Sequence, residues 1–303
     1  MRNLTDFQQK MADLLPELEL RHNESLAKHT SFRIGGPVEV MAFPKTAAEL
    51  TKVLKVSALL DCKTAILGAG TNILAPDEGL SGLVICLKDC LGGMERIDDT
   101  RIKVAAGVTM TRAAVFAANE GLSGLEFAHG IPGTVGGGVY MNAGAYGGEI
   151  CQVCTRVEVM DLTGNLRIYS NEEMGFSYRH SRLEDEGGIV VSAVFELISK
   201  PTEEIRAVMQ DLMARRSASQ PLDLPSAGSA FKRPVGGYAA ALIDSAGLKG
   251  HRIGNAAVSE KHAGFVVNLG GATAEDVKNL LADVSDRVFR ESGIRLEPEV
   301  RIW

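Results

Sequence analysis

Four polar clusters of the sequence carry side chains that could bind anions or take part in proton transfer. They are Tyr178-Arg179, Ser229, Lys261-His262 and Glu297-Pro298-Glu299. Residue type and spacing alone do not identify any of these clusters as a functional site. A serine in a glycine-rich loop is usually a turn residue, and paired glutamates usually face solvent. Ser229 has no G-x-S-x-G sequence around it, which excludes the nucleophile elbow of serine hydrolases.

The stretch from Gly124 to Gly148 is dense in glycine, which occupies nine of its 25 positions. Glycine is costly to order and is used where the backbone takes a positive φ or approaches another group closely. Phe127, Val135 and Met141 are interleaved with the glycines, so the stretch should lie inside a folded body. Its buried N–H and C=O groups then need partners. A large polar ligand would supply them, and tight turns between short strands would explain the glycines equally well.

A second glycine-containing segment, Gly68–Leu74, directly follows an expected strand at Thr64–Leu67. It begins like the dinucleotide fingerprint G-x-G-x-x-G, but Ile73 stands at the sixth position, and Pro76 and Gly79 come too soon for a long helix. A Rossmann site needs the N-terminus of such a helix for the pyrophosphate, so we reject this interpretation. A phosphate-binding nest of successive backbone N–H groups needs no helix. Such a nest and a plain turn are therefore the two remaining interpretations of this segment.

Length and composition are those of an ordinary globular protein with room for two domains: 303 residues, 45% hydrophobic and 23% charged. The net charge of −6 argues against a nucleic-acid partner. No apolar run approaches the about 20 residues of a membrane span, and the first residues lack the apolar core of a signal peptide. We therefore expect a cytoplasmic protein with no membrane insertion. Cys151 and Cys154 form an isolated C-x-x-C, and we expect structural thiols there rather than a metal or redox site.

Hydrophobic periodicity predicts a mixture of helices and strands. We expect helices at about 3–16, 46–59, 110–120, 238–245 and 273–292. A further helix should present one apolar face made of Ile205, Val208, Met209, Leu212 and Met213. We expect strands at 38–43, 64–67, 83–87, 101–105, 153–162, 165–169, 189–198, 264–269 and 294–303. The strand-helix-strand order over residues 38–67 predicts two parallel strands. Because the composition shifts near Ser199-Lys200-Pro201, we place a domain boundary near residue 200.

Ordered motifs from about residue 29 to residue 301 make the sequence similar to one family. They are Thr-Ser-Phe-Arg-Ile-Gly-Gly-Pro, Leu-Gly-Ala-Gly-Thr-Asn-Ile-Leu, Gly-Ile-Pro-Gly-Thr-Val-Gly-Gly, Met-Asn-Ala-Gly-Ala-Tyr-Gly-Gly-Glu, Tyr-Arg-His-Ser, Ala-Gly-Ser-Ala-Phe-Lys-Arg-Pro, Ser-Glu-Lys-His-Ala-Gly-Phe and Leu-Glu-Pro-Glu-Val-Arg. Each motif is weak alone, but the ordered set is specific. The chain resembles the UDP-N-acetylenolpyruvoylglucosamine reductases (MurB), FAD enzymes of bacterial cell-wall synthesis. It resembles the shorter of the two family types, which lacks an extra tyrosine-bearing substrate loop.

The resemblance implies an α+β fold with an FAD-binding region of two α+β subdomains, of the vanillyl-alcohol-oxidase/PCMH-like kind, and an α+β substrate domain. The FAD-binding region would cover residues 1–200, with subdomains at about 1–68 and 69–200. The substrate-binding domain would cover 201–303, with the C-terminal tail returning to the active site. FAD would be bound non-covalently, with its pyrophosphate held by backbone N–H groups. The implied cofactor-binding residues are Gly35, Gly68, Ala69, Gly70, Thr71, Asn72, Leu74, Gly130, Ile131, Pro132, Gly133, Thr134, Gly136, Gly137, Asn142, Ala143, Gly144 and Ala145.

The resemblance also implies that Arg179, Ser229 and Glu299 are the catalytic residues. Glu299 is chosen over Glu297 because the family's glutamate directly precedes Val-Arg. NADPH would reduce the flavin, and the flavin would pass hydride to the enol ether of UDP-N-acetylglucosamine enolpyruvate, which yields UDP-N-acetylmuramate for peptidoglycan synthesis. Arg179 and Glu299 would polarise the substrate carboxylate, and Ser229 would protonate the neighbouring carbon. The implied substrate-binding residues are Tyr178, Lys232, Arg233, Lys261 and His262, of which Arg233 departs from an asparagine of the longer type.

Two other functions fit the same residues. One is a different FAD oxidoreductase or oxidase on the same scaffold. Some such enzymes attach FAD covalently through a histidine, and His129 lies in the stretch Gly124–Gly148, although packing or hydrogen bonding is the commoner role of such a histidine. The other is a non-catalytic nucleotide-binding protein. The partners that we expect are a UDP-sugar and NADPH; the sequence does not fix the oligomeric state, and a monomer is compatible with it.

Overall fold

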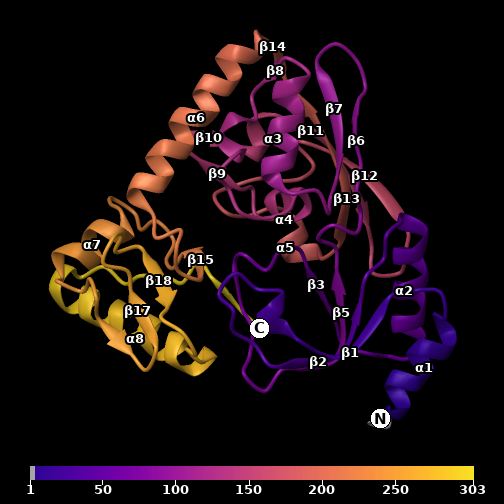
Figure 1. Ribbon diagram of the computed structural model, residues 1–303, viewed down its shortest axis with the longest axis horizontal. Helices are drawn as coiled ribbons and strands as arrows, with labels where there is room; N and C mark the ends of the chain where they lie inside the picture. The colour runs from indigo at the N-terminus through magenta and orange to yellow at the C-terminus, as the bar shows by residue number, and fades with distance from the viewer. Residues whose placement is uncertain (1–3) are drawn as a thin grey trace. The chain divides into compact units, whose positions relative to one another are not determined.

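The computed structural model describes residues 4–303, which form two compact units, each built from several stretches of sequence. Unit 1 holds the residues up to Asn23, Glu39–Ala69 and Ser81–Ala214, and unit 2 holds Glu24–Val38, Gly70–Leu80 and Arg215–Trp303. The colours of Figure 1 follow the chain through these stretches. The segments Glu24–Val38 and Gly70–Leu80 thus belong to the same unit as the C-terminal residues. A single domain boundary near residue 200 does not predict this grouping. The functional division into 1–200 and 201–303 stays a prediction.

The first sheet, most of which belongs to unit 1, has the strand order β1-β2-β5-β3. These strands are Leu20–Ser25, Pro37–Ala42, Leu80–Cys86 and Thr64–Leu67. Helix α2 (Ala47–Leu59) connects β2 to β3, and its buried Leu50 and Val53 share a hydrophobic core with the sheet and with α1 (Asp6–Leu14). Thr46 caps α2 by accepting a hydrogen bond from the Glu49 N–H, as its sequence predicted. Strand β5 lies between β2 and β3 and is parallel to β3. The predicted helix at 3–16 is α1, and its residue 3 lies outside the described residues.

The second sheet of unit 1 has the order β12-β11-β13-β7-β6, and its neighbouring strands are antiparallel. These strands are Leu166–Ser170, Cys154–Met160, Ile189–Glu196, Arg101–Ala105 and Met94–Arg96. Helices α3 (Met110–Asn119) and α4 (Val135–Tyr140) share its hydrophobic core (Figure 1). The shorter elements of unit 1 are β8 (Leu122–Ser123), η2 (Glu126–Ala128), β9 (Gly144–Ala145), β10 (Gly148–Glu149), η3 (Ile150–Gln152), α5 (Leu183–Glu186) and β14 (Ile198–Ser199). The predicted hairpin around Thr163-Gly164 is confirmed as β11–β12.

Helix α4 lies inside the glycine-dense stretch, where the sequence predicted a loop rather than a helix. It contains three consecutive glycines, and each glycine costs a helix interior about 1 kcal/mol relative to alanine. Close packing explains them: a Cβ at Gly136 would lie 2.9 Å from the Cβ of Ala106, and a Cβ at Gly138 would lie 2.7 Å from the Sδ of Met110. The glycines therefore let α4 approach its neighbours within unit 1, and that packing overrides their poor helix propensity.

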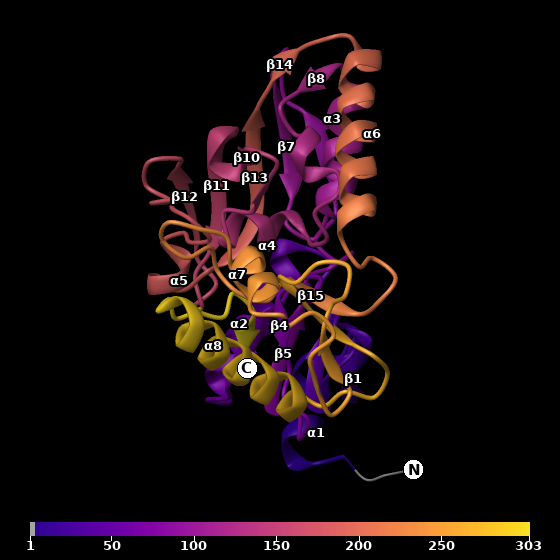
Figure 2. The ribbon, with the colours of Figure 1, turned by 90° about the vertical axis from the view of Figure 1, so that its left-hand side faces the viewer.

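Unit 2 is built on a sheet of order β15-β18-β17-β16. These strands are Ser226–Ser229, Phe265–Asn268, Ala256–Val258 and Arg252–Ile253, and the helices are α7 (Ala239–Ser245), α8 (Ala274–Ser292) and the short η1 (Leu26–Lys28). Helix α8 packs on β16 and β17. Figure 2 shows this helix along its length. Thr273 forms the predicted cap of α8, and Gly293 ends it in the left-handed region at φ +73°. Asp77 accepts hydrogen bonds from the N–H groups of Ala274 and Glu275, which fastens the 70–80 segment to the start of α8.

Two predictions at the level of elements need correction. The predicted five-residue apolar face lies on α6 (Thr202–Ser219). The buried part of this face is narrower than predicted, because Ile205 and Met209 are buried while Val208 is 48% exposed. The expected strand at 294–303 is reduced to Arg301–Ile302 (β19). Pro298 has no N–H to donate, which limits pairing just before that strand. Among residues 4–303, no helix is long and apolar enough to cross a membrane.

Candidate active site

The loop after β3 turns sharply at Gly70. Its φ is +61°, and a Cβ there would lie 2.2 Å from the carbonyl oxygen of His29. The Gly70 carbonyl accepts a hydrogen bond of 3.0 Å from the Ser31 N–H. Strand β4 (Ile73–Leu74) follows this loop instead of a long helix, in agreement with the rejection of a Rossmann site. The loop is therefore shaped by the backbone, and glycine is required at its corner.

The second loop, Gly130–Gly137, leads into α4 and is closely tied to the protein. The N–H groups of Val135 and Gly136 donate to the carbonyls of Val108 and Ala106 at 2.8 and 2.9 Å, and the Gly137 N–H donates to Thr134 Oγ1 at 3.3 Å. These three N–H groups are thus used within unit 1. Gly133 has φ +141°, a backbone conformation that side chains disfavour. The N–H groups of the earlier residues Gly130, Ile131, Gly133 and Thr134 are the other backbone donors that this loop contains, and the role of Gly136 and Gly137 in cofactor binding stays a prediction.

The two loops meet within unit 1, and the residues at this point suit an anionic cofactor. A Cβ at Gly68 would lie 2.7 Å from Oγ1 of Thr134, although the two residues are far apart in sequence. Neither Gly68–Leu74 nor Gly130–Gly137 contains an acidic residue. Small side chains and the absence of carboxylates fit the pyrophosphate of FAD, which binds well to backbone N–H groups.

Arg179 lies at the tip of a tight turn in unit 1. The Ser177 and His180 backbones exchange hydrogen bonds of 3.1 and 3.2 Å across it, and Arg179 takes φ +57°. Its Nη2 donates to the carbonyl of Gly144 at 3.2 Å, and its guanidinium lies 5.0 Å from the ring centre of Tyr178. The structure therefore places Arg179 beside the Asn142–Ala145 segment, which the resemblance assigns to the flavin.

Ser229 and Glu299 come together in unit 2. Ser229 is exposed at the end of β15, and the next residue, Ala230, accepts a 2.9 Å hydrogen bond from the Glu299 N–H. The Glu299 carbonyl accepts from Nδ2 of Asn72 at 3.2 Å, and the Arg301 N–H donates to the Asn72 carbonyl at 3.0 Å. Strand β19 also pairs in parallel with β4. The C-terminal tail thus runs beside the predicted cofactor loop and carries Glu299 with it.

The environments of Glu297 and Glu299 differ. The Glu297 side chain is 75% exposed and forms an ion pair of 3.6 Å with Lys232. Glu299 is only partly exposed, and its backbone is bonded on both sides. The choice of Glu299 over Glu297, which was made from the motif alone, stays a prediction.

The other predicted substrate-binding side chains have partners inside unit 2. Lys261 Nζ donates to the Ser217 carbonyl at 2.6 Å, and the Arg233 guanidinium lies 4.1 Å from the ring centre of Tyr238. His262 packs edge-on against Phe265 with ring centres 5.0 Å apart. Burial lowers the pKa of His262, so its imidazole is neutral near pH 7.

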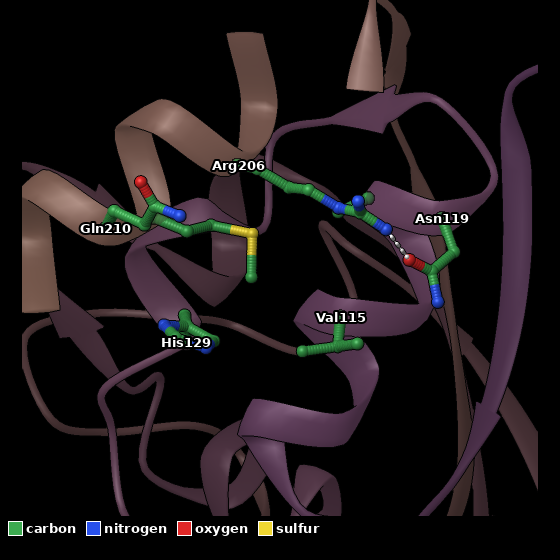
Figure 3. Close-up of a pocket in the computed structure, with 7 residues that line it drawn as sticks. Val115, Asn119, His129, Arg206 and Gln210 are labelled. Atoms are coloured by element: carbon green, nitrogen blue, oxygen red, sulfur yellow. Dashed lines mark hydrogen bonds between the residues drawn. The ribbon is translucent and has the colours of Figure 1, made fainter. Parts of the chain in front are cut away.

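His129 lines a cavity that the sequence did not indicate (Figure 3). The cavity measures about 240 Å³ and lies between α3 and α6, with Val115, Ala118, Asn119, Arg206, Met209 and Gln210 as its other lining residues. Arg206 Nη2 donates to Oδ1 of Asn119 at 2.9 Å across its mouth. Nδ1 of His129 is buried and has no hydrogen-bond partner among residues 4–303. No sequence signal marks this cavity, because its residues are scattered over three segments.

The C-x-x-C pair consists of free thiols. Burial raises the pKa of Cys154 to about 12, and burial also raises the pKa of Cys151. Thiols with raised pKa values are poor nucleophiles and poor metal ligands at neutral pH. Within the described part of the chain, no group of His, Cys, Asp and Glu side chains could hold a metal ion.

Comparison with known proteins gives matches along nearly the whole chain. A family model described as UDP-N-acetylenolpyruvoylglucosamine reductase, C-terminal domain, matches residues 220–303, and one described as FAD binding domain matches residues 38–170. The UDP-N-acetylenolpyruvoylglucosamine reductase of Agathobacter rectalis is 44% identical over 98% of this chain and 98% of its own length. The enzyme of that name from Caldanaerobacter subterraneus is 45% identical over 97% of this chain and 96% of its own length.

A solved structure agrees with these sequence matches. The crystal structure of UDP-N-acetylenolpyruvylglucosamine reductase (MurB) from Thermus caldophilus superposes with a TM-score of 0.77 at 37% identity, covering 95% of this chain and 99% of that chain. The predicted α+β FAD-binding fold, the cofactor FAD and the assignment as an FAD-dependent oxidoreductase are confirmed. The chain belongs to the UDP-N-acetylenolpyruvoylglucosamine reductase family.

Proposed function

We propose that this chain uses NADPH to reduce the enolpyruvyl group of UDP-N-acetylglucosamine enolpyruvate, which yields UDP-N-acetylmuramate for peptidoglycan precursor synthesis. Membership of the reductase family supports this activity. The observation that carries it is the arrangement of unit 2, where the backbone of Glu299 binds Ala230, next to Ser229, on one side and Asn72 of the cofactor loop on the other.

Each catalytic residue has a role that suits its chemistry. When bound, FAD supplies the redox chemistry, taking hydride from NADPH and giving it to the substrate enol ether. Negative charge then develops on the carbon that bears the substrate carboxylate. Arg179 would bind this carboxylate through its paired N–H donors, and Glu299 would polarise it by donating a hydrogen bond, which requires the Glu299 carboxyl group to be protonated. Ser229 donates its hydroxyl proton to the strongly basic carbon, which completes the reduction.

The remaining site residues are proposed to hold the cofactor and the UDP-sugar. Gly68–Leu74 and Gly130–Thr134 would hold the FAD pyrophosphate through backbone groups, and Gly35 would support the first loop. Tyr178, Lys232, Arg233, Lys261 and His262 would contact the substrate. Lys261 and Lys232 already have oxygen partners in unit 2, so substrate phosphates would have to compete for these ammonium groups. We further propose that FAD is held non-covalently and that the protein works in the cytoplasm.

The proposed function is tested by following flavin absorbance in two separate steps. NADPH should bleach the oxidised flavin, and anaerobic addition of the enolpyruvyl sugar nucleotide should restore its colour. Protein that binds FAD but shows neither step would be a non-catalytic binder, and protein reoxidised only by oxygen would be an oxidase. Acid precipitation tests the mode of attachment: a colourless pellet is expected, whereas a yellow pellet would show a covalent bond, with His129 as the first candidate.

A further inference from the structure

Asn142 is a buried side chain that joins three segments of unit 1. It is 1% exposed, and it takes φ +43°, which is unusual for a residue with a side chain. Its Nδ2 donates to the Ser177 carbonyl at 3.0 Å and to Oε2 of Glu149 at 3.2 Å, and its Oδ1 accepts from the Cys151 N–H at 2.9 Å. Both carboxamide hydrogens are therefore used inside the protein.

Two of the segments that Asn142 joins determine where Arg179 lies. Ser177, whose carbonyl Asn142 holds, closes the tight turn that carries Arg179. The Arg179 guanidinium donates to the carbonyl of Gly144, and Gly144 pairs with Glu149 in the β9–β10 hairpin. Asn142 thus fixes the turn that presents Arg179 and the hairpin that receives its guanidinium.

Arg179 needs such support because its own backbone is unfavourable. A left-handed conformation costs a residue with a Cβ roughly 1–2 kcal/mol, and it persists only where surrounding contacts enforce it. Its side chain is also long, with considerable rotamer entropy to lose. Contacts that hold the turn and the side chain are therefore needed if the Arg179 guanidinium is to bind the substrate carboxylate in a defined orientation.

We propose that Asn142 is a positioning residue for Arg179, which holds its guanidinium where it binds the substrate carboxylate. Asn142 would thus act on the substrate step through Arg179, and any contact of residue 142 with the flavin would come from its backbone. This inference rests on the proposed function, which makes Arg179 a substrate-binding catalytic residue.

Asn142→Gly is the most suitable variant, because glycine tolerates the positive φ and the change removes only the carboxamide. We expect NADPH to bleach its flavin at the wild-type rate, while reoxidation by the enolpyruvyl sugar nucleotide slows about tenfold through misplacement of Arg179. Arg179→Ala should slow the same step by about 100-fold, since it removes a donor to the developing charge. The double variant Asn142→Gly/Arg179→Ala should fall within about twofold of Arg179→Ala alone, because the two residues act as a unit.

Asn171→Ala is the matched control. Nδ2 of Asn171 also donates to two backbone carbonyls, those of Cys151 and Cys154, at 2.7 and 2.6 Å. It bonds neither to the turn at Ser177 nor to Gly144, and it reaches Asn142 only through the backbone of Cys151. Asn171→Ala should destabilise the protein without slowing reoxidation. If Asn142→Gly does not fold, Asn142→Asp serves instead, because aspartate also tolerates a positive φ. The aspartate keeps an oxygen that can accept from the Cys151 N–H, but it loses the N–H groups that donate to Ser177 and Glu149. Asn142→Asp should therefore slow reoxidation at least as much as Asn142→Gly.

Three outcomes would overturn the inference, and they are distinguishable. If the losses of Asn142→Gly and Arg179→Ala multiply in the double variant, Asn142 acts independently of Arg179. If Asn142→Gly slows bleaching by NADPH as much as reoxidation, the residue serves the cofactor. If Arg179→Ala itself reoxidises at the wild-type rate, the proposed role of Arg179 is wrong and the inference falls with it.

Discussion

The two regions that carry the proposed catalytic residues are held in place by different kinds of bond. In unit 1, Arg179 lies in a left-handed turn, and side-chain bonds from Asn142 to the Ser177 carbonyl and from Ser181 to the Tyr140 carbonyl flank this turn. In unit 2, Ser229 and Glu299 are placed by backbone pairing, through β15, Ala230 and the tail beside β4. A substitution can remove a side-chain bond but leaves a backbone bond intact. We therefore expect the position of Arg179 to be sensitive to mutation, and the positions of Ser229 and Glu299 to be robust unless the backbone itself is disturbed.

The largest effect is expected from Ser229→Ala. Because backbone bonds hold this segment, the variant should fold and bind FAD normally and lose only the proton donor. Reoxidation by the enolpyruvyl substrate should slow by about 10³-fold, within the range of general acid catalysis, while bleaching by NADPH stays unchanged. Ser219→Ala, which alters an exposed serine in α6, is the control. Reoxidation of Ser229→Ala at the wild-type rate would show that another group supplies the proton.

Gly70→Ala tests how far unit 2 depends on its backbone conformation. The new Cβ would lie 2.2 Å from the His29 carbonyl oxygen, at a φ of +61°. The clash and the left-handed backbone together should cost about 3 kcal/mol or more in the free energy of unfolding and should reduce FAD content. Gly293→Ala has a similar φ of +73° but open space around it, so it should cost only about 1 kcal/mol. Urea unfolding measures both, and equal losses would mean that the close approach at Gly70 is unimportant.

Ser181→Ala tests the side-chain support of unit 1. The Ser181 side chain is fully buried, and its Oγ donates to the Tyr140 carbonyl at 2.8 Å. Removing this hydroxyl deletes one hydrogen bond inside unit 1 and should cost about 1 kcal/mol of stability. Because Ser181 follows the Arg179 turn, substrate reoxidation should also slow, while NADPH bleaching does not. A stability loss with unchanged reoxidation would show that the turn holds its shape without this bond.

The smallest effect concerns pH and His262 in unit 2. Burial lowers its folded pKa below the ordinary value of 6.5, so the unfolded chain binds a proton more readily than the folded one. This histidine therefore favours unfolding as the pH falls through 6.5 towards its folded pKa, and has no such effect above 6.5. His262→Gln should lose less thermal stability than the wild-type protein between about pH 7 and pH 5. If the melting temperatures of the two proteins fall equally between about pH 7 and pH 5, the lowered pKa of His262 does not contribute to the loss of stability.

Local signals predicted many of the elements. Thr46 and Thr273 mark helix starts that the structure confirms as caps, and Gly293 marks a helix end. These signals work because capping is settled by residues close in sequence. The motif order also predicted the family, the fold and FAD, although the site residues themselves stay predictions.

The features that sequence reasoning missed depend on contacts between distant residues. Helix α4 forms despite its glycines, because they let it pack against Ala106 and Met110. The grouping of segments 24–38 and 70–80 with the C-terminal residues likewise arises from tertiary packing. The sequence placed Asn142 near the flavin, yet its bond to Ser177 spans 35 positions, and no periodic pattern reveals it.

The activity that we propose for this chain is the transfer of hydride through FAD to an enolpyruvyl sugar nucleotide. Its most direct test is anaerobic mixing of the NADPH-reduced protein with UDP-N-acetylglucosamine enolpyruvate, followed by flavin absorbance. We predict that the oxidised spectrum returns and that one equivalent of UDP-N-acetylmuramate forms per flavin. A flavin that stays reduced until oxygen is admitted would contradict the claim.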